Sequence, residues 1–228
     1  MMGKTLSKAM MLAMATGIMA TPAAIAEGEF SANVAFTTEY VYRGVTQTDG
    51  APTVSGGLDW ASDDFYVGGW MSGVDFGDGT STEVDIYAGF TPTVGMFDLD
   101  LGAIYYIYPD APDDPEQNFV EVYAGASTTV SGIDLGASYA YSPEFYGETG
   151  SAGYTNFTAG TALGENFGID ASVGFSDFYD SGNDSYTDYS VGVTTSVQEY
   201  FDLDFRAIAT SGLDGNDEKF VVTLSRSL

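Results

Sequence analysis

The sequence predicts an all-β protein, a transmembrane antiparallel up-and-down β-barrel of about twelve strands. Three observations predict this fold class. Apolar and polar residues alternate with a period of two through most of the chain. The connections between alternating segments are short and long in turn, and the last nine residues form one more such segment. Short turns at one end and long loops at the other are typical of outer-membrane barrels, whereas a soluble sandwich gives loop length no reason to differ by end.

Residues 1–26 have the pattern of a secretory signal peptide and are excluded from the barrel. Lys4 and Lys8 supply positive charge, residues 9–20 are apolar, and Ala24-Ile25-Ala26 gives a small-x-small motif before Glu27. The apolar run is too short to span about 30 Å of hydrocarbon. We therefore expect cleavage after Ala26 and a mature barrel of residues 27–228.

The alternation defines the strands in order along the chain. In residues 97–107 every second residue from Phe97 to Ile107 is apolar, and the other face begins with Asp98 and Asp100. Residues 201–209 repeat this pattern. By the same criterion, strands are expected to begin near residues 30, 53, 65, 82, 97, 118, 132, 154, 167, 186, 201 and 219.

The links between these strands alternate in length. The short ones are 61–64, 93–96, 129–131, 163–166 and 198–199. The longer, turn-rich ones are 44–51, 75–81, 109–117, 142–153, 180–184 and 211–218. The first strand is accordingly expected to run as far as Arg43. A hairpin of 32 to 36 residues repeats through the chain and aligns Asp100, Asp134, Asp170 and Asp204 at spacings of 34, 36 and 34 residues.

Aromatic residues near the strand ends indicate that the apolar faces meet lipid, since membrane barrels carry aromatic girdles at both interfaces. Toward the short turns the girdle would contain Phe30, Trp60, Phe65, Phe97, Phe167 and Phe201. Toward the long loops it would contain Tyr42, Tyr105, Tyr139 and Phe175. The polar faces would then line the lumen.

The composition excludes several kinds of chemistry. The chain has no His and no Cys, so it lacks Ser-His-Asp and thiol catalysis and the usual zinc ligands. Its formal charge of −27 argues against nucleic acid as a partner, because phosphate binding depends on Lys and Arg. We expect no catalytic residues, no metal site and no cofactor, although an enzyme working with paired carboxylates alone stays open as an alternative.

One block of sequence resembles a known family. Tyr40-Val41-Tyr42-Arg43-Gly44-Val45-Thr46-Gln47-Thr48 is followed by a glycine-rich segment ending at Trp60, and together they resemble the opening signature of the TorF-type porins, also called Gcw_chp outer-membrane proteins. The resemblance covers essentially the whole mature chain. It implies an exported bacterial outer-membrane barrel acting as a channel, and it brings neither a solute nor catalytic residues.

Strand parity gives the residues expected to line the pore. They are Glu39, Arg43, Asp59, Asp85, Asp100, Glu121, Asp134, Asp170, Asp188, Asp204 and Arg206. Carboxylates lining a narrow pore attract cations, so we expect a porin-like channel for small solutes that prefers cations. The four aligned aspartates would form a ring near the periplasmic mouth, or they would only solvate the lumen.

The two arginines of this set allow more than one interpretation. Arg206 would meet Asp204, Asp188 or a carboxylate of the ring, and would either narrow the pore or form a wall salt bridge. Arg43 would pair with Glu39 or hold the loop 44–51 inward. The alternative to a channel is a narrow or plugged structural or adhesive barrel, with inward tyrosines such as Tyr66 and Tyr123 filling the lumen.

The expected partners follow from the location. They are the lipid and lipopolysaccharide of the outer membrane, the barrel assembly machinery through the C-terminal strand, and small solutes or cations.

Overall fold

The computed structural model describes residues 28–180, 182–197, 200–213 and 218–228. The expected signal peptide, residues 1–26, lies outside these residues. The chain forms a closed barrel of twelve antiparallel strands, as the alternation predicted. In chain order the strands are β1 (Glu29–Thr37), β4 (Thr53–Ser62), β5 (Phe65–Gly73), β6 (Thr82–Phe90), β8 (Phe97–Ile107), β9 (Phe119–Val130), β10 (Ile133–Ser142), β11 (Ala152–Leu163), β12 (Phe167–Phe178), β13 (Tyr186–Val197), β14 (Phe201–Ser211) and β15 (Lys219–Ser227).

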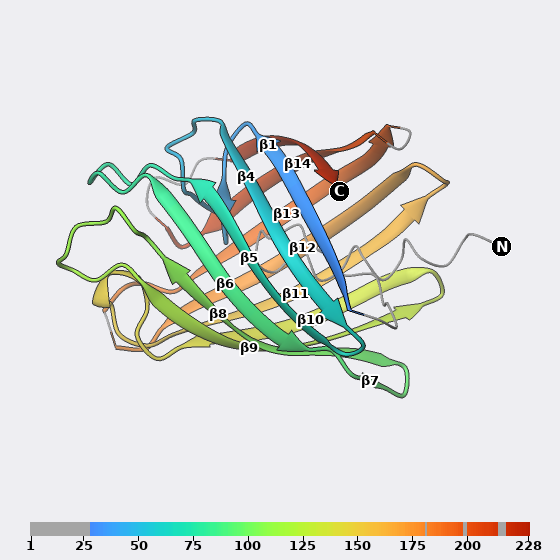
Figure 1. Ribbon diagram of the computed structural model, residues 1–228, viewed down its shortest axis with the longest axis horizontal. Coiled ribbons are helices and arrows are strands. Elements are labelled where there is room, and N and C mark those ends of the chain that lie inside the picture. Colours follow the sequence, from blue (N-terminus) through green and yellow to red (C-terminus); the bar gives the residue numbers. More distant parts are fainter. Residues whose placement is uncertain (1–27, 181, 198–199, 214–217) are drawn as a thin grey trace.

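Each of the twelve strands pairs with its neighbours in this chain order, and the pairing of the first strand with the last closes the ring. β1 pairs with β15, with Val34 opposite Arg226. β6 pairs with β8, with Ala88 opposite Ala103. In Figure 1 the long loops lie at the left end of the barrel and most of the short turns at the right. The strands are 9 to 12 residues long, which is close to the roughly 9–11 residues that cross a bilayer when tilted.

In the described part of the chain, four short elements lie outside the ring or extend it. They are β2 (Val41–Tyr42), β3 (Val45–Thr46), β7 (Thr93–Val94) and the 3₁₀ helix η2 (Tyr146–Glu148). β7 pairs with the start of β8, and β2 and β3 form a separate two-stranded sheet. Among the described residues, no helix is long and apolar enough to cross a bilayer.

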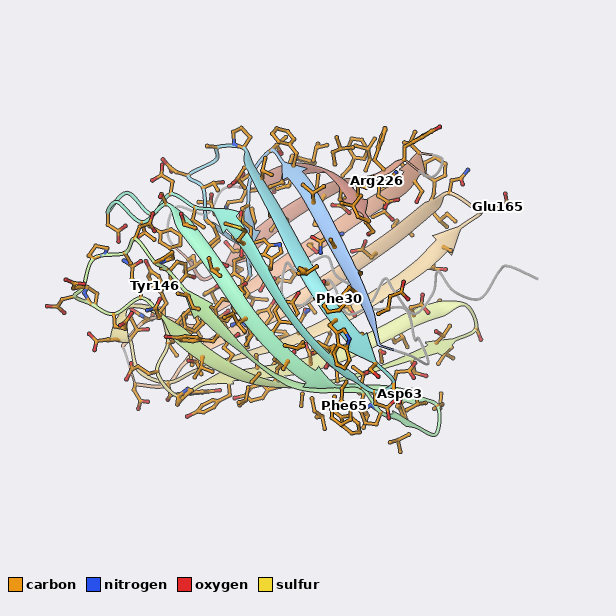
Figure 2. The ribbon with its side chains drawn as sticks, viewed as in Figure 1. Phe30, Asp63, Phe65, Tyr146, Glu165 and Arg226 are labelled. Atoms are coloured by element: carbon orange, nitrogen blue, oxygen red, sulfur yellow. The ribbon has the colours of Figure 1, made fainter. Side chains whose placement is uncertain are left out.

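The outer face of the ring is apolar and carries the aromatic residues expected there. Phe30, Phe65 and Phe97 are exposed toward the short turns, and Tyr105 and Tyr139 toward the long loops. Figure 2 shows Phe65 and Asp63 at the short-turn end and Tyr146 at the long-loop end. The apolar faces therefore point outward and the polar faces inward, as parity predicted.

The first strand is shorter than expected. It ends at Thr37, where the Oγ1 hydroxyl donates to the carbonyl of Glu39 (2.9 Å) and the chain bends away from the ring. The following residues form the β2–β3 hairpin, which we call the Arg43 hairpin (residues 41–46). The placement of Tyr42 in the outer girdle was wrong, because Tyr42 packs against aromatic residues inside the barrel.

Candidate functional site: the lumen of the barrel

The Arg43 hairpin folds into the lumen near the long-loop end. Its turn residues, Arg43 and Gly44, have φ angles of 47° and 81°, as the two central residues of a type I′ turn require. The hairpin base is fixed by Gln47 N–H donating to the carbonyl of Tyr40 (2.7 Å) and by the Tyr40 hydroxyl donating to Glu83 (2.9 Å). The two-residue turn thus directs the arginine toward the far wall.

The Arg43 guanidinium binds Glu121 through both of its terminal nitrogens. Nη1 donates to Oε1 (2.9 Å) and Nη2 to Oε2 (2.6 Å). Only 6% of the Arg43 side chain and 2% of the Glu121 side chain are exposed. The guanidinium carbon also lies over two rings, 4.2 Å from the Tyr154 centroid and 4.6 Å from the Tyr42 centroid. Parallel charge-assisted hydrogen bonds and aromatic faces are the contacts that favour arginine over lysine.

The tip of the hairpin also touches the wall at two other strands. A Cβ added to Gly44 would lie 2.2 Å from Cγ2 of Thr210 on β14 and 2.9 Å from Cβ of Asp188 on β13. With Glu121 on β9 and Tyr154 on β11, the tip thus meets four strands, while the hairpin grows from β1. The Arg43 hairpin therefore crosses the lumen.

An aromatic cluster fills the lumen beside the hairpin, against β5, β6, β8 and β9. Its buried members are Tyr40, Trp70, Val74, Tyr87, Ile104, Tyr106, Tyr108 and Phe119. Within it, the rings of Tyr106 and Phe119 are stacked with centroids 4.3 Å apart. The Tyr106 hydroxyl donates to Glu121 (3.1 Å) and so joins the cluster to the Arg43 pair. Inward tyrosines fill part of the lumen, as the alternative interpretation required.

Carboxylates on the remaining inner surface accept from tyrosine hydroxyls. Tyr87 donates to Asp59 (2.5 Å) and Tyr66 to Asp100 (2.9 Å). Tyr66 is also hydrogen bonded to Tyr123. The buried acidic side chains among the described residues are Asp59, Glu83, Asp85, Asp100, Glu121, Asp170, Asp188 and Asp204.

Arg206 lies along the wall and not across the lumen. It donates twice to Asp170 on β12 (2.7 and 3.1 Å) and twice to Asp204 on its own strand (3.0 and 3.2 Å). Between them it covers Gly192 on β13, where an added Cβ would lie 2.4 Å from Nη2. The geometry is that of a wall salt bridge, one of the two interpretations that the sequence left open.

The four aligned aspartates differ in their partners and do not form a uniform ring. Asp170 and Asp204 share Arg206, and Asp100 is held by Tyr66. Asp134 is half-buried and accepts from the Thr129 hydroxyl (2.5 Å).

The expected pairing of Arg43 with Glu39 is not found, because the strand ends before Glu39 and the turn carries Arg43 to Glu121 instead. Glu39 is half-buried at the base of the hairpin.

Two inward carboxylates near the hairpin have an oxygen without a hydrogen-bond partner among the described residues. These oxygens are Oδ1 of Asp85 and Oδ2 of Asp188. Asp85 is 1% exposed and Asp188 is 5% exposed. In the described part of the chain, no three acidic, His or Cys side chains are grouped so as to hold a metal ion.

Tyr154 is an inward residue that sequence reasoning did not select. Tyr154 contacts Arg43, and its hydroxyl donates to Asp188 (3.2 Å). Strand parity could have found it, because Tyr154 shares a face with Asn156.

Outside the strands, aspartates tie the long loops together. Asp110 accepts from the hydroxyl and backbone N–H of Ser81, and these bonds hold its pKa below the ordinary value. The hydroxyl and backbone N–H of Ser151 lower the pKa of Asp180 in the same way. Because these pKa values are depressed, the stabilisation is present above the ordinary aspartate pKa and is lost as the pH falls through the lowered one. Acid below the ordinary aspartate pKa should therefore loosen these loops.

Comparison with known proteins places this barrel among porin folds. A family described as "Bacterial protein of unknown function (Gcw_chp)" matches residues 21–227. A KdgM porin superposes with a TM-score of 0.64 at 7% identity, covering 87% of this chain and 99% of the porin. A KdgM porin in complex with disordered oligogalacturonate superposes with a TM-score of 0.62 at 6% identity, covering 87% of this chain and 98% of the porin. The NanC porin superposes with a TM-score of 0.54 at 6% identity, and the match again covers 87% of this chain and 98% of the porin. No curated protein sequence matches.

Proposed function

We propose that this chain, which belongs to the Gcw_chp family, is an outer-membrane channel for the passive diffusion of small solutes, with a preference for cations. The observation that carries the proposal is the charge of the lumen inside a closed barrel with an apolar outer face. Among the described residues, eight buried carboxylates share the lumen with Arg43 and Arg206, each of which is already paired with a carboxylate. The TorF-type porin assignment is part of this proposal.

The lumen chemistry supports cations over anions. Carboxylates in a narrow, partly desolvated passage raise the local concentration of cations and repel anions. One structural neighbour was solved with oligogalacturonate, which is a polyanion. The acidic lumen here argues for solutes of the opposite charge, and the lack of His and Cys argues against an enzyme.

Ion selectivity tests the proposal. In a planar bilayer under a KCl gradient, we expect the reversal potential to lie between zero and the equilibrium potential of potassium. Asp134→Asn should lower the ratio of cation to anion permeability, because Asp134 is a half-buried carboxylate near the short-turn mouth. Asp63→Asn is the matched control, because Asp63 is exposed in a short turn. A reversal potential between zero and the equilibrium potential of chloride would refute cation preference.

A plugged barrel remains the second candidate, because the Arg43 hairpin and the aromatic cluster occupy much of the lumen. Single-channel conductance separates the two, since a plugged barrel would give no steps in the wild-type protein.

The membrane location predicts a position-dependent cost for charge on the outer face. Val191→Arg, at the middle of β13, should lower the free energy of unfolding by about 2–4 kcal/mol, whereas Val94→Arg in β7 should cost about 0–1 kcal/mol. Both valines are exposed, and Val191 lies at the middle of its strand whereas Val94 lies beside a short turn. The measurement is guanidinium chloride unfolding in lipid vesicles. Equal costs at the two sites would contradict a membrane-spanning barrel.

The proposed partners follow from the location. Lipid and lipopolysaccharide would meet the apolar belt, and the barrel assembly machinery would engage β15. We propose cleavage after Ala26 during export.

A further inference from the structure

Arg43 is surrounded by a carboxylate and two aromatic rings. Glu121 supplies two carboxylate oxygens at 2.9 and 2.6 Å, and Tyr42 and Tyr154 supply ring faces at 4.6 and 4.2 Å. A carboxylate and aromatic faces together are the groups that recognise guanidinium and substituted ammonium ions. The site has this chemistry whether the guanidinium belongs to the chain or to a solute.

The arginine that fills this site is attached to the barrel only through the hairpin. β2 and β3 form their own two-stranded sheet, so withdrawing them breaks no pairing in the ring of twelve strands. Arg43 also holds a left-handed backbone conformation, which side chains other than glycine adopt rarely and which persists only when the surroundings impose it. The contacts with Glu121 and the two tyrosines are the ones that impose it here.

The acidic side chains around the site outnumber the single carboxylate with which Arg43 pairs. Glu83 and Asp85 lie on β6 beside Glu121, and Asp188 lies against Gly44 at the hairpin tip. All three are buried, and Asp85 and Asp188 each have a carboxylate oxygen without a hydrogen-bond partner among the described residues. A second cation entering beside Arg43 therefore meets carboxyl oxygens that have no hydrogen-bond partner among the described residues.

We infer that Arg43 occupies the place of a guanidinium- or ammonium-bearing solute, and that such a solute displaces it from Glu121 and moves the Arg43 hairpin out of the passage. The inference rests on the proposed channel and names its solute class. Guanidinium is favoured over simple ammonium, because only a planar fork reproduces the two parallel bonds to Glu121.

Chemical complementation in planar bilayers tests the inference, with methylguanidinium as the probe and potassium as the charge carrier. Arg43→Ala should conduct more than the wild type, and millimolar methylguanidinium should reduce its current by entering the site. In Arg43→Ala/Glu121→Gln this block should weaken by about ten- to a hundredfold, the value of a hydrogen bond to a charged group. In the wild type, methylguanidinium should raise the current. Tetramethylammonium, which cannot donate hydrogen bonds, should block Arg43→Ala less.

Two controls keep the outcomes separate. Heat-modified mobility in gels establishes that each variant is folded, and Arg43→Lys, which keeps the charge without the fork, is the milder variant if alanine prevents folding. Binding is also measured without current, because methylguanidinium should raise the melting temperature of Arg43→Ala but not of the double variant.

A cation-selective current that methylguanidinium changes equally in Arg43→Ala and in the double variant overturns this inference and leaves the channel intact. No current in the wild type or in Arg43→Ala overturns the channel itself.

Discussion

Gly44→Ala is expected to increase the single-channel conductance several-fold by forcing the Arg43 hairpin out of the lumen. An added methyl group at Gly44 would overlap Thr210 and Asp188, and the φ angle of 81° is unfavourable for alanine. Backbone strain costs about 1–3 kcal/mol. Overpacking costs a further 1–3 kcal/mol or so unless the tip moves. Movement of the tip relieves the overlap, because the hairpin is not part of the ring.

Gly50→Ala is the matched control for this variant. Gly50 has a φ angle of 75°, nearly that of Gly44, but nothing lies within 4 Å of an added Cβ. Both variants should lose stability through strain, and only Gly44→Ala should change the current. Equal conductance in the two variants would show that the hairpin does not obstruct the passage.

Arg206→Ala is expected to destabilise the barrel strongly. It leaves Asp170 and Asp204 close together without their shared cation, and Asp170 is fully buried. Removing one member of a buried ion pair costs about 3–5 kcal/mol, and the lower end applies because 20% of the Arg206 side chain is exposed. The measurement is equilibrium unfolding in lipid vesicles.

Rescue by a second substitution separates charge from packing. Arg206→Ala/Asp170→Asn should recover much of the loss, because the remaining carboxylate of Asp204 no longer faces a like charge. Conductance should change less than in Gly44→Ala, since Arg206 lies along the wall over Gly192 and does not cross the lumen. If the double variant is as unstable as Arg206→Ala, the loss of stability comes from lost packing and not from charge repulsion.

The sequence predicted the strands well because a barrel wall imposes a period of two on every residue. Residues from Phe97 to Ile107 alternate between lipid and lumen, and in the structure β8 begins at Phe97 and ends at Ile107. The inward orientation of Asp100, Asp170 and Asp204 follows from the same parity. Solvent and lipid act on each residue separately, so a local pattern is enough to predict the face.

The hairpin was not predictable by that rule, because alternation continues across Thr37 and Glu39 as if the strand went on. Its turn is Arg-Gly, whereas Asn-Gly and Asp-Gly are the usual signals of a type I′ turn. The turn is stabilised by Glu121, 78 residues away, and no local pattern reports such a contact. Tyr42 was misplaced for the same reason.

The position of this hairpin also bears on how the chain assembles. The seam joins β1 to β15, whose paired residues are far apart in sequence, from Asn33 with Ser227 to Thr37 with Thr223. The Arg43 hairpin directly follows β1, and its contacts lie on β9, β11, β13 and β14. It must therefore be enclosed as the seam forms. Contacts of such long sequence separation make folding slow. The rate-limiting step of folding should thus be a single event. In it, β1 pairs with β15, and the ionic and aromatic contacts inside the lumen form at the same time.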